Sequence, residues 1–470
     1  MIRLRFSRLA AMALVVLVAA SAGRGAAPNP FDGPGYEWAR PWKDNSIQPP
    51  PDVQPAKLPP VAPQPGDGET ERIYRAAIAW FDWAIEHVDQ LVPAAEKAAP
   101  GLIDGGRMFA AGNAGWVQDF YGRAGGFSFL SDAFQEHTTA VAPKDLIMIG
   151  MTTPRDECGW RLDFSTLTTG GGWNYPCTVV HFAGHQWPLI DRTLPLVRRQ
   201  NWGGRLFLID TGAPTGSSWS DVSLRQMAAT AMGWAFCGEL FAAATRKGKT
   251  LATYASDCEP NGKDWDKTVE GLNLHPKAAV PPIPAGQIAR QYLRTCRRQV
   301  AEFLDAGEAR RIRQAAQRLA ATLSDGKACF VVVSGHIHVR GAIIPREFAN
   351  MAMYGRGWEW RPQVIRPGDM LLWVGYLDYP AAEVEKALAS GGKAVTLTAS
   401  DGPTDDSRIN INGHWDKWDT VVNVAGLPVR ILPTSGVVQT PQWYALMAEA
   451  LKDFRAAAGA EKHTPIKMGG

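Results

Sequence analysis

The chain has 470 residues, which is too long for one ordinary hydrophobic core and favours two domains with appended segments. Hydrophobic residues make up 46% and charged residues 20%, as in a folded protein and unlike a disordered one. The formal charge of +3 disappears when Arg3, Arg5 and Arg8 near the amino terminus are left out. A chain without net positive charge is an improbable partner for nucleic acid.

The first 22 residues have the pattern of a secretory signal. Three arginines precede the apolar run from Leu9 to Ala20, and Ala20-Ser21-Ala22 is a small-x-small cleavage site. The run is shorter than the roughly 20 apolar residues of a membrane span. We therefore expect residues 1–22 to be removed, the protein to be periplasmic or secreted, and no transmembrane segment to remain.

Residues 23–68 are rich in proline and lack periodicity, which predicts an extended arm. Six cysteines are present without a C-x-x-C pair, which argues against a zinc site or a disulfide-built scaffold. Local bridges between Cys158 and Cys177 or between Cys237 and Cys258 stay open. No metal or other cofactor is indicated.

The first half begins with a helix at about Thr70 and continues with four apolar runs of strand length. These runs are found within residues 107–113, 145–151, 178–184 and 205–212, and a long helix follows over Val222 to Arg246. A second Pro-rich segment, residues 261–284, is expected to be a linker.

The same order of elements recurs after this segment. A helical region over residues 285–323 leads to a strand within 325–335. Met370 to Gly375 then predicts a buried strand, followed by a short helix that Asp378 can cap, a strand over Ala394 to Thr398, a strand within 409–415 and a helix after Ser435.

This alternation predicts an α/β fold with two doubly wound parallel sheets in tandem. The expected domains are residues 69–260 and 285–458, with a tail over 459–470. In such sheets the ligand binds at the carboxyl ends of the strands.

Two stretches carry a resemblance to a known family. "DGGRMFAAGNAGW" is similar to the first strand and phosphate loop of sugar isomerase domains, and "PGDMLLWVGYLDYPAAEVEKALASGGKAVTLTAS" resembles their second strand, loop, helix and third strand. This module occurs singly or in tandem in phosphosugar isomerases and sugar-sensing regulators. The resemblance covers about residues 70–258 and 285–455, and it implies a sugar or sugar phosphate as ligand.

The resemblance also implies ligand-binding residues in the first half, although the loops depart from the family pattern. Asn113 and Gly115 are kept, but Trp116 replaces a serine that holds phosphate. "RAGG", which starts at Arg123, matches a run seen after that loop. The second loop offers further donors to an anion, namely Thr152, Thr153 and Arg155.

The corresponding loop of the second half, "GYLDYPAAE", has lost the small hydroxyl residues. Tyr376 and Asp378 stand there, and the carboxylate of Asp378 would repel an anion. We therefore expect an unphosphorylated ligand, or an anion held by the first half alone.

Several residues are candidates for chemistry, and each has a plain structural alternative. Ser334 and His336 end a strand, and the histidine is either an acid/base or sugar-contacting group or a loop anchor; a metal site would need His338 and His414 as well. Glu239 stands where sugar isomerases often carry a proton-transferring glutamate, or it is a solvated or partner-facing side chain. Thr434 and Ser435 start a helix, as caps or as ligand contacts.

The chain has 18 tryptophans, and eight of them fall near predicted loop ends, where they could stack on a sugar or fill the interface between the halves. These are Trp116, Trp173, Trp187, Trp219, Trp358, Trp360, Trp415 and Trp418.

The sequence thus predicts an exported tandem sugar isomerase-type protein, with a homodimer as a further expectation. As an enzyme it would interconvert an aldose and a ketose with Glu239 or His336 as base. The alternative is a non-catalytic carbohydrate-binding or sensing protein of the cell envelope. A buried, close acid/base pair in the pocket would favour the enzyme.

Overall fold

The structure is a computed structural model that describes residues 67–112, 114–131, 141–150, 176–182, 206–214, 218–334, 344–345, 347–354, 365–416 and 418–459. All of these residues belong to one compact unit. The signal sequence, most of the Pro-rich arm and nearly all of the tail lie outside the described residues, so the expectations for them stay predictions.

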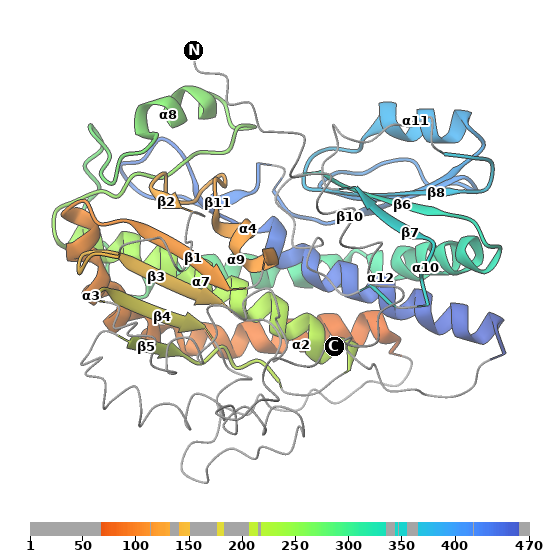
Figure 1. Ribbon diagram of the computed structural model, residues 1–470, viewed down its shortest axis with the longest axis horizontal. Coiled ribbons are helices and arrows are strands. Elements are labelled where there is room, and N and C mark those ends of the chain that lie inside the picture. The colour runs from red at the N-terminus through yellow and green to blue at the C-terminus, as the bar shows by residue number, and fades with distance from the viewer. Residues whose placement is uncertain are drawn as a thin grey trace, which may run out of the picture. The chain divides into compact units, whose positions relative to one another are not determined.

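Each half contributes a separate five-stranded parallel sheet, as Figure 1 shows. The first sheet has the order β2-β1-β3-β4-β5 and the second the order β7-β6-β8-β9-β10, so each strand has a counterpart in the other half. This confirms the predicted α/β fold class. The strands are β1 (Met108–Gly112), β2 (Leu130–Ser131), β3 (Leu146–Gly150), β4 (Thr178–Phe182), β5 (Leu206–Ile209), β6 (Cys329–Ser334), β7 (Met351–Tyr354), β8 (Met370–Gly375), β9 (Lys393–Thr398) and β10 (Arg408–Asn412).

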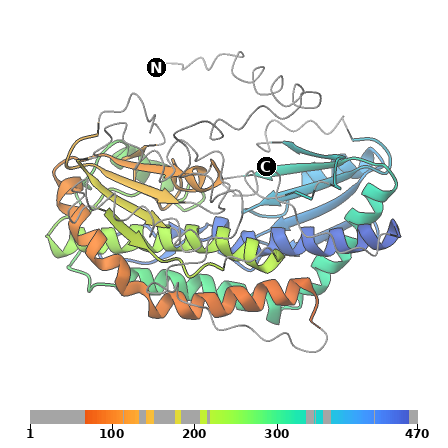
Figure 2. The ribbon, with the colours of Figure 1, turned by 60° about the horizontal axis from the view of Figure 1, so that its bottom comes forward.

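Long helices form the layers beneath the two sheets, as Figure 2 shows. α3 packs on α7 as α10 packs on α12, and α7 contacts α9 as α12 contacts α2. The packing of the helices therefore repeats together with the strand order. The helices are α2 (Glu69–Glu86), α3 (Val92–Ile103), α7 (Trp219–Arg246), α9 (Gln287–Asp305), α10 (Glu308–Ser324) and α12 (Ser435–Ala457).

Two helical regions that the sequence presents as continuous are broken in the structure. The first is interrupted by a short 3-10 helix, η4 (Val88–Leu91), because Pro93 fits the first turn of a new helix. The second breaks at Gly307, whose φ of 77° is left-handed and favours glycine. In both cases a proline or glycine marks the break.

Shorter elements complete the fold. α4 (Ala114–Phe120) follows β1, and α11 (Ala381–Ala389) packs on β8 and β9, with Pro380 rather than Asp378 at its cap position. The segment expected to be a linker contains α8 (Gly262–Val269), and its Leu274 forms an antiparallel bridge with Leu251 outside it. β11 (Thr420–Val422) and β12 (Ile431–Pro433) form a small antiparallel pair before α12.

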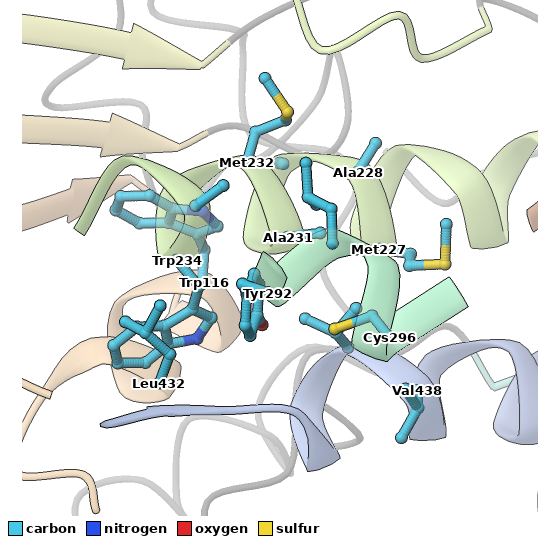
Figure 3. Packing of buried hydrophobic residues seen from close by; sticks show 14 of the residues in the cluster. Trp116, Met227, Ala228, Ala231, Met232, Trp234, Tyr292, Cys296, Leu432 and Val438 are labelled. Carbon is cyan, nitrogen blue, oxygen red and sulfur yellow. The ribbon is translucent and has the colours of Figure 1, made fainter. Parts of the chain in front are cut away.

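One core joins both halves. In Figure 3, Met227 and Trp234 of α7 pack among Tyr292 of α9 and Val438 of α12. Within the described part of the chain, α7 alone has the length and mean hydropathy of a membrane span, and its most apolar stretch is fully buried in the protein. Such burial is typical of a core helix.

Cys237, Cys258, Cys296 and Cys329 are free thiols. Cys237 and Cys258 do not form the local bridge that the sequence left open, and Cys158 lies outside the described residues. Burial raises the pKa of the Cys237 thiol, so it packs as a small apolar side chain.

Candidate functional site

The carboxyl edges of the two sheets meet at the start of α12. On the first-half side, Asp119 of α4 lies so close that a Cβ on Gly436 would be 2.3 Å from its Oδ1. On the second-half side, Gln439 donates from Nε2 to the carbonyl of Gly375, the last residue of β8, at 2.7 Å. This is where a fold of this type is expected to present its ligand site.

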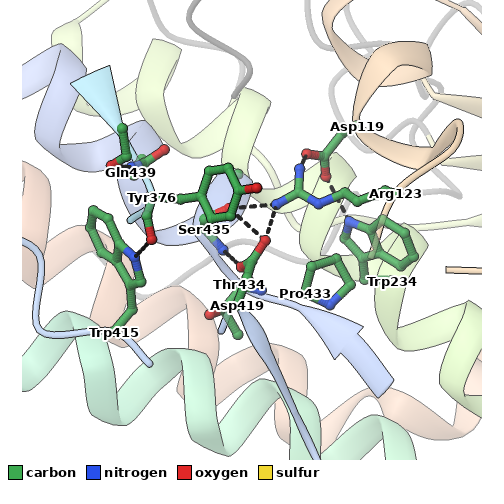
Figure 4. Close-up of polar contacts among 12 residues, drawn as sticks. Asp119, Arg123, Trp234, Tyr376, Trp415, Asp419, Pro433, Thr434, Ser435 and Gln439 are labelled. Carbon is green, nitrogen blue, oxygen red and sulfur yellow. Dashed lines mark hydrogen bonds and ion pairs between the residues drawn. The ribbon is translucent and has the colours of Figure 1, made fainter. Parts of the chain in front are cut away.

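A buried polar cluster, which we name the Arg123 cluster, occupies this position (Figure 4). The Arg123 guanidinium pairs with Asp119 and, at 2.9 Å, with Asp419, while Trp234 donates to the second oxygen of Asp119 at 2.6 Å. Burial alone would lower the pKa of Arg123, but the two carboxylates outweigh burial and raise it. The cluster comprises Asp119, Arg123, Trp234, Asp419, Thr434 and Ser435.

Asp419 caps α12 from outside the helix. Its Oδ1 accepts the backbone N–H groups of Thr434 at 3.0 Å and Ser435 at 2.6 Å, and its Oδ2 accepts the Ser435 hydroxyl at 2.9 Å. Arg123 also donates to the Ser435 hydroxyl oxygen at 2.5 Å. The structure thus brings together three residues predicted to bind ligand, Arg123, Thr434 and Ser435, and engages them with the protein's own carboxylates.

Trp116 covers the carboxyl edge of the first sheet. It is fully buried, and a Cβ on Gly150, the last residue of β3, would lie 2.0 Å from its indole ring. The ring also packs on Phe120 and Phe182 at centroid distances of 4.5 and 6.0 Å. Trp116 therefore fills the edge and is not free to stack on a ligand.

Half-buried polar and aromatic groups line the carboxyl edge of the second sheet. Ser334 ends β6 and Tyr376 follows β8, both partly exposed. Burial, followed by the nearby Cys258 and Asp419, raises the pKa of Tyr376 to about 12, so its phenol stays protonated. The buried Trp415 donates to the Tyr376 carbonyl at 3.2 Å and supports this loop.

His414 and Glu308 form a pair at the end of β10. His414 Nε2 lies 3.5 Å from Glu308 Oε1, and the imidazole is 27% exposed while the carboxyl is 4% exposed. Burial raises the pKa of Glu308, and Arg311 and His414 oppose that change. The backbone of His414 has a left-handed φ of 55°, with its N–H held by the side chain of Asn412. Such strain in a non-glycine residue is common at functional sites.

Arg430 is a further described arginine near this edge. It pairs with Glu259 at 3.0 Å and Asp416 at 2.9 Å, and its guanidinium carbon lies 5.1 Å from the ring centroid of Trp418. Like Arg123, it is bound by two carboxylates. Both arginines therefore sit in surroundings that are net negative.

Glu239, the predicted isomerase base, is completely buried and has both oxygens engaged. Oε1 pairs with Arg246 at 2.7 Å, and Oε2 accepts the N–H of Gly286 at the start of α9 at 2.6 Å. Burial raises its pKa, while Arg246 and the Gly286 bond act in the opposite direction. This geometry favours a capping role for Glu239 over proton transfer.

The remaining predicted residues are placed less fully. Gly115 lies in α4, where it belongs to a helix and not to an open loop. No group of three or more potential metal ligands occurs among the described residues. Some predicted residues lie outside the described residues, namely Asn113, Thr152, Thr153, Arg155, His336 and His338.

Sequence reasoning missed Asp119, Asp419, Glu308 and Trp234. The four-residue spacing of Asp119 and Arg123 is one that ion pairs on helices use, and it could have indicated the first contact. Asp419 has no comparable local signal, because its partners are brought to it only by the fold.

Comparison with known proteins gives structural likenesses at low sequence identity. The structure is similar to the C-terminal domain of glucosamine-fructose-6-phosphate aminotransferase from Francisella tularensis (TM-score 0.44, 11% identity, 81% of this chain and 96% of that chain). It is also similar to a protein assigned as a phosphosugar isomerase from Clostridium difficile 630, with a TM-score of 0.43 and 10% identity over 85% of this chain and 100% of that chain. A third similar structure is assigned as a tagatose-6-phosphate ketose/aldose isomerase from Clostridium novyi NT, with a TM-score of 0.40 and 7% identity over 86% of this chain and 95% of that chain. No protein-family profile and no curated protein sequence matches the chain.

Proposed function

We propose that this protein binds an uncharged sugar or sugar derivative at the carboxyl edge of its second sheet. The observation that carries the proposal is the charge state of this edge: among the residues that the structure describes there, Arg123 and Arg430 are each bound by two carboxylates, and Arg311 is paired with Glu308. A phosphate dianion needs several charge-assisted donors to offset its desolvation, and the charges of Arg123 and Arg430 are already balanced by carboxylates.

Polar side chains at this edge support the same reading. The hydroxyl of Ser334, the protonated phenol of Tyr376 and the imidazole of His414 are all partly exposed at this edge. Hydroxyl, phenol and imidazole groups both donate and accept hydrogen bonds, as the hydroxyls of a sugar require.

Titration calorimetry of the protein with neutral aldoses, ketoses and cyclitols and with their phosphate esters tests this. We expect a neutral sugar to bind, and His414→Gln to weaken it at least about tenfold, or roughly 1.4 kcal/mol. His275→Gln is the matched control, since His275 stacks on Trp265 of α8 and does not lie at this edge. A phosphate ester that binds more than about tenfold tighter than its parent sugar would overturn the proposal.

Isomerisation stays a separate prediction. Glu239 is occupied as a cap of α9, so the remaining candidate base is His336. Proton exchange at the second carbon of a bound aldose, followed by NMR in deuterated water, would reveal it. Sugar binding without exchange would favour the non-catalytic alternative.

Export of the protein is also part of the proposal. It is supported by the arginine-rich start, the apolar run and the cleavage site within residues 1–22. Mass spectrometry of the protein isolated from cells is expected to find a mature amino terminus near Gly23.

A further inference from the structure

Four donors converge on the carboxylate of Asp419. They are the backbone N–H groups of Thr434 and Ser435, the Ser435 hydroxyl and the Arg123 guanidinium, at 2.6 to 3.0 Å. We call this donor set the α12 cradle. Figure 4 shows Asp419 and Arg123 facing each other across the start of α12.

The α12 cradle has the composition of an oxyanion site. A helix amino terminus with free N–H groups, a hydroxyl and a guanidinium is the combination that binds carboxylate and phosphate groups in proteins. All three residues that supply donors are buried, with exposed fractions of 0% for Thr434, 1% for Ser435 and 2% for Arg123. The Thr434 hydroxyl is also buried and has no hydrogen-bond partner among the described residues, so a further polar atom is present on the same residue.

The anion that fills the α12 cradle comes from a distant part of the chain. Asp419 precedes Ser435 by 16 residues and follows Arg123 by 296 residues. It is not a helical capping residue in the usual position, because the cap position of α12 is held by Thr434, whose side chain makes no capping bond. The carboxylate of Asp419 therefore stands where an external anionic group would otherwise bind.

We propose that Asp419 determines ligand specificity by occupying the α12 cradle and closing it to anionic groups. The cradle adjoins Tyr376, at the carboxyl end of β8, so an anionic substituent of a ligand at that edge would have to displace Asp419. With Asp419 in place the site accepts uncharged ligands, and without its carboxylate the same donors bind a carboxylate or phosphate. The sugar part of this inference rests on the proposed function, whereas the anion part does not.

The test uses the full chain with the substitution Asp419→Gly. Asp419 has a left-handed φ of 69°, which glycine adopts freely, so the variant removes the carboxylate without adding backbone strain. Thermal and chemical unfolding are followed with sodium formate, inorganic phosphate or chloride at matched ionic strength. At a formate concentration of ten times its Kd, the folding equilibrium of the variant is expected to shift by about tenfold toward the native state.

Wild type is expected to show no such shift beyond the chloride effect. Asp221→Gly is the matched control, because Asp221 shares the exposed cap of α7 with Ser218 and no described arginine donates to it. Arg123→Met combined with Asp419→Gly should abolish the formate effect. Equal responses of wild type and Asp419→Gly, or no response in either, would overturn the inference.

If Asp419→Gly folds only when formate is present, that dependence supports the inference, and Asp419→Ala provides the second variant for titration. If neither variant responds to formate or phosphate although one of them folds, the α12 cradle is not an anion site. A second experiment with sugars separates the two proposals. The ratio of the affinity for a phosphate ester to the affinity for its parent sugar should be at least tenfold higher in Asp419→Gly than in wild type. If formate stabilises Asp419→Gly but no sugar binds to the protein, the inference about the α12 cradle is supported and the proposed sugar-binding function is rejected.

Discussion

The amino termini of α7 and α12 hold corresponding positions in the two halves but are stabilised in different ways. At α7 the cap is local and exposed: the Ser218 hydroxyl accepts the Asp221 N–H, and the Asp221 carboxylate accepts the Ser218 N–H, both at 3.1 Å. At α12 the cap is buried and comes from Asp419, with Arg123 of the other half beside it. The two halves therefore share an architecture but not the way in which these helices begin. The start of α12 takes part in a buried contact between the halves, that of Asp419 with Arg123.

The same two helices are alike further along. Glu239 of α7 accepts the N–H of Gly286 at the start of α9, and Glu449 of α12 accepts the N–H of Thr70 in the first turn of α2 at 3.1 Å. Each half thus supplies a buried carboxylate to the first helix of the other half. This exchange accounts for Glu239 without assigning it any chemistry.

The largest expected effect comes from Arg123→Met. The substitution leaves Asp119 and Asp419 buried without their cation, and removing one partner of a buried ion pair costs about 3–5 kcal/mol. Denaturant unfolding of the variant should show that loss. Arg430→Met is the control, since that side chain is 17% exposed and one of its partners, Asp416, is 52% exposed. If Arg123→Met lost no more unfolding free energy than Arg430→Met, the start of α12 would not depend on the buried Arg123–Asp419 pair as described.

Much of the fold could be predicted because its signals are local. Met370 to Gly375 is a strand with the predicted bounds, since six consecutive apolar or small residues are all buried between helices. The long helix expected from Val222 begins three residues earlier, at Trp219, because the capping box of Ser218 and Asp221 extends it. The likeness of the two halves followed from the repeat, whereas the order of the strands within each sheet and the edge strands β2 and β7 did not.

The candidate site could be predicted only in part, because its contacts are not local. Arg123, Thr434 and Ser435 were named from loop patterns, but their common partner Asp419 lies before a three-residue strand with no motif around it. His414 was considered only as a metal ligand, and its pairing with Glu308 depends on α10 packing against β10. The role of Trp116 depends in the same way on Gly150, the last residue of a neighbouring strand.

The ends of the corresponding strands β3 and β8 offer a second test of the comparison. A Cβ on Gly150 would lie 2.0 to 2.3 Å from the buried Trp116 ring, whereas a Cβ on Gly375 would lie 2.7 Å from Nε1 of Trp373, which is 8% exposed. Overpacking a core typically costs 1–3 kcal/mol, so we expect Gly150→Ala to lose about 2–3 kcal/mol and Gly375→Ala about 1 kcal/mol.

Thermal unfolding of both glycine variants measures this difference. Adding Trp116→Leu to Gly150→Ala should recover part of the loss, because the smaller side chain makes room for the methyl group. Equal losses for the two single variants would show that the indole of Trp116 does not cover the first edge as tightly as described.

The pH dependence of stability distinguishes the two glutamates that share Arg246. Burial raises the pKa of Glu239 above its usual 4.5, so its contribution is fully present below about pH 4.5 and is lost as the pH rises through the folded-state pKa. Burial acts on Glu96 as well, but Lys247 and Arg246 lower its pKa, so its contribution is present above 4.5 and is lost on acidification.

Unfolding free energies measured from pH 4 to pH 7 should therefore change in opposite directions for the two substitutions. The stability of wild type relative to Glu239→Gln is expected to fall as the pH rises, and that relative to Glu96→Gln to increase. The effect at Glu96 should be the weaker one, because that side chain is 36% exposed and solvent screens its ion pairs. If both stability differences changed with pH in the same direction, the ion pair with Arg246 would determine the pKa shift of both carboxyl groups.

The smallest expected effect is at the exposed cap. Ser218→Ala removes the hydroxyl that accepts the Asp221 N–H, and losing such a cap costs about 1 kcal/mol. Ser435→Ala should cost more, about 1–3 kcal/mol, because it leaves Asp419 and Arg123, which are both buried, each short of one hydrogen-bond partner. If the denaturant dependence of the unfolding free energy is the same in both serine variants, their midpoint shifts give the ratio of the two stability losses directly. A larger loss at Ser218 than at Ser435 would reverse the comparison, since it would place the critical helix end in the exposed, locally capped half.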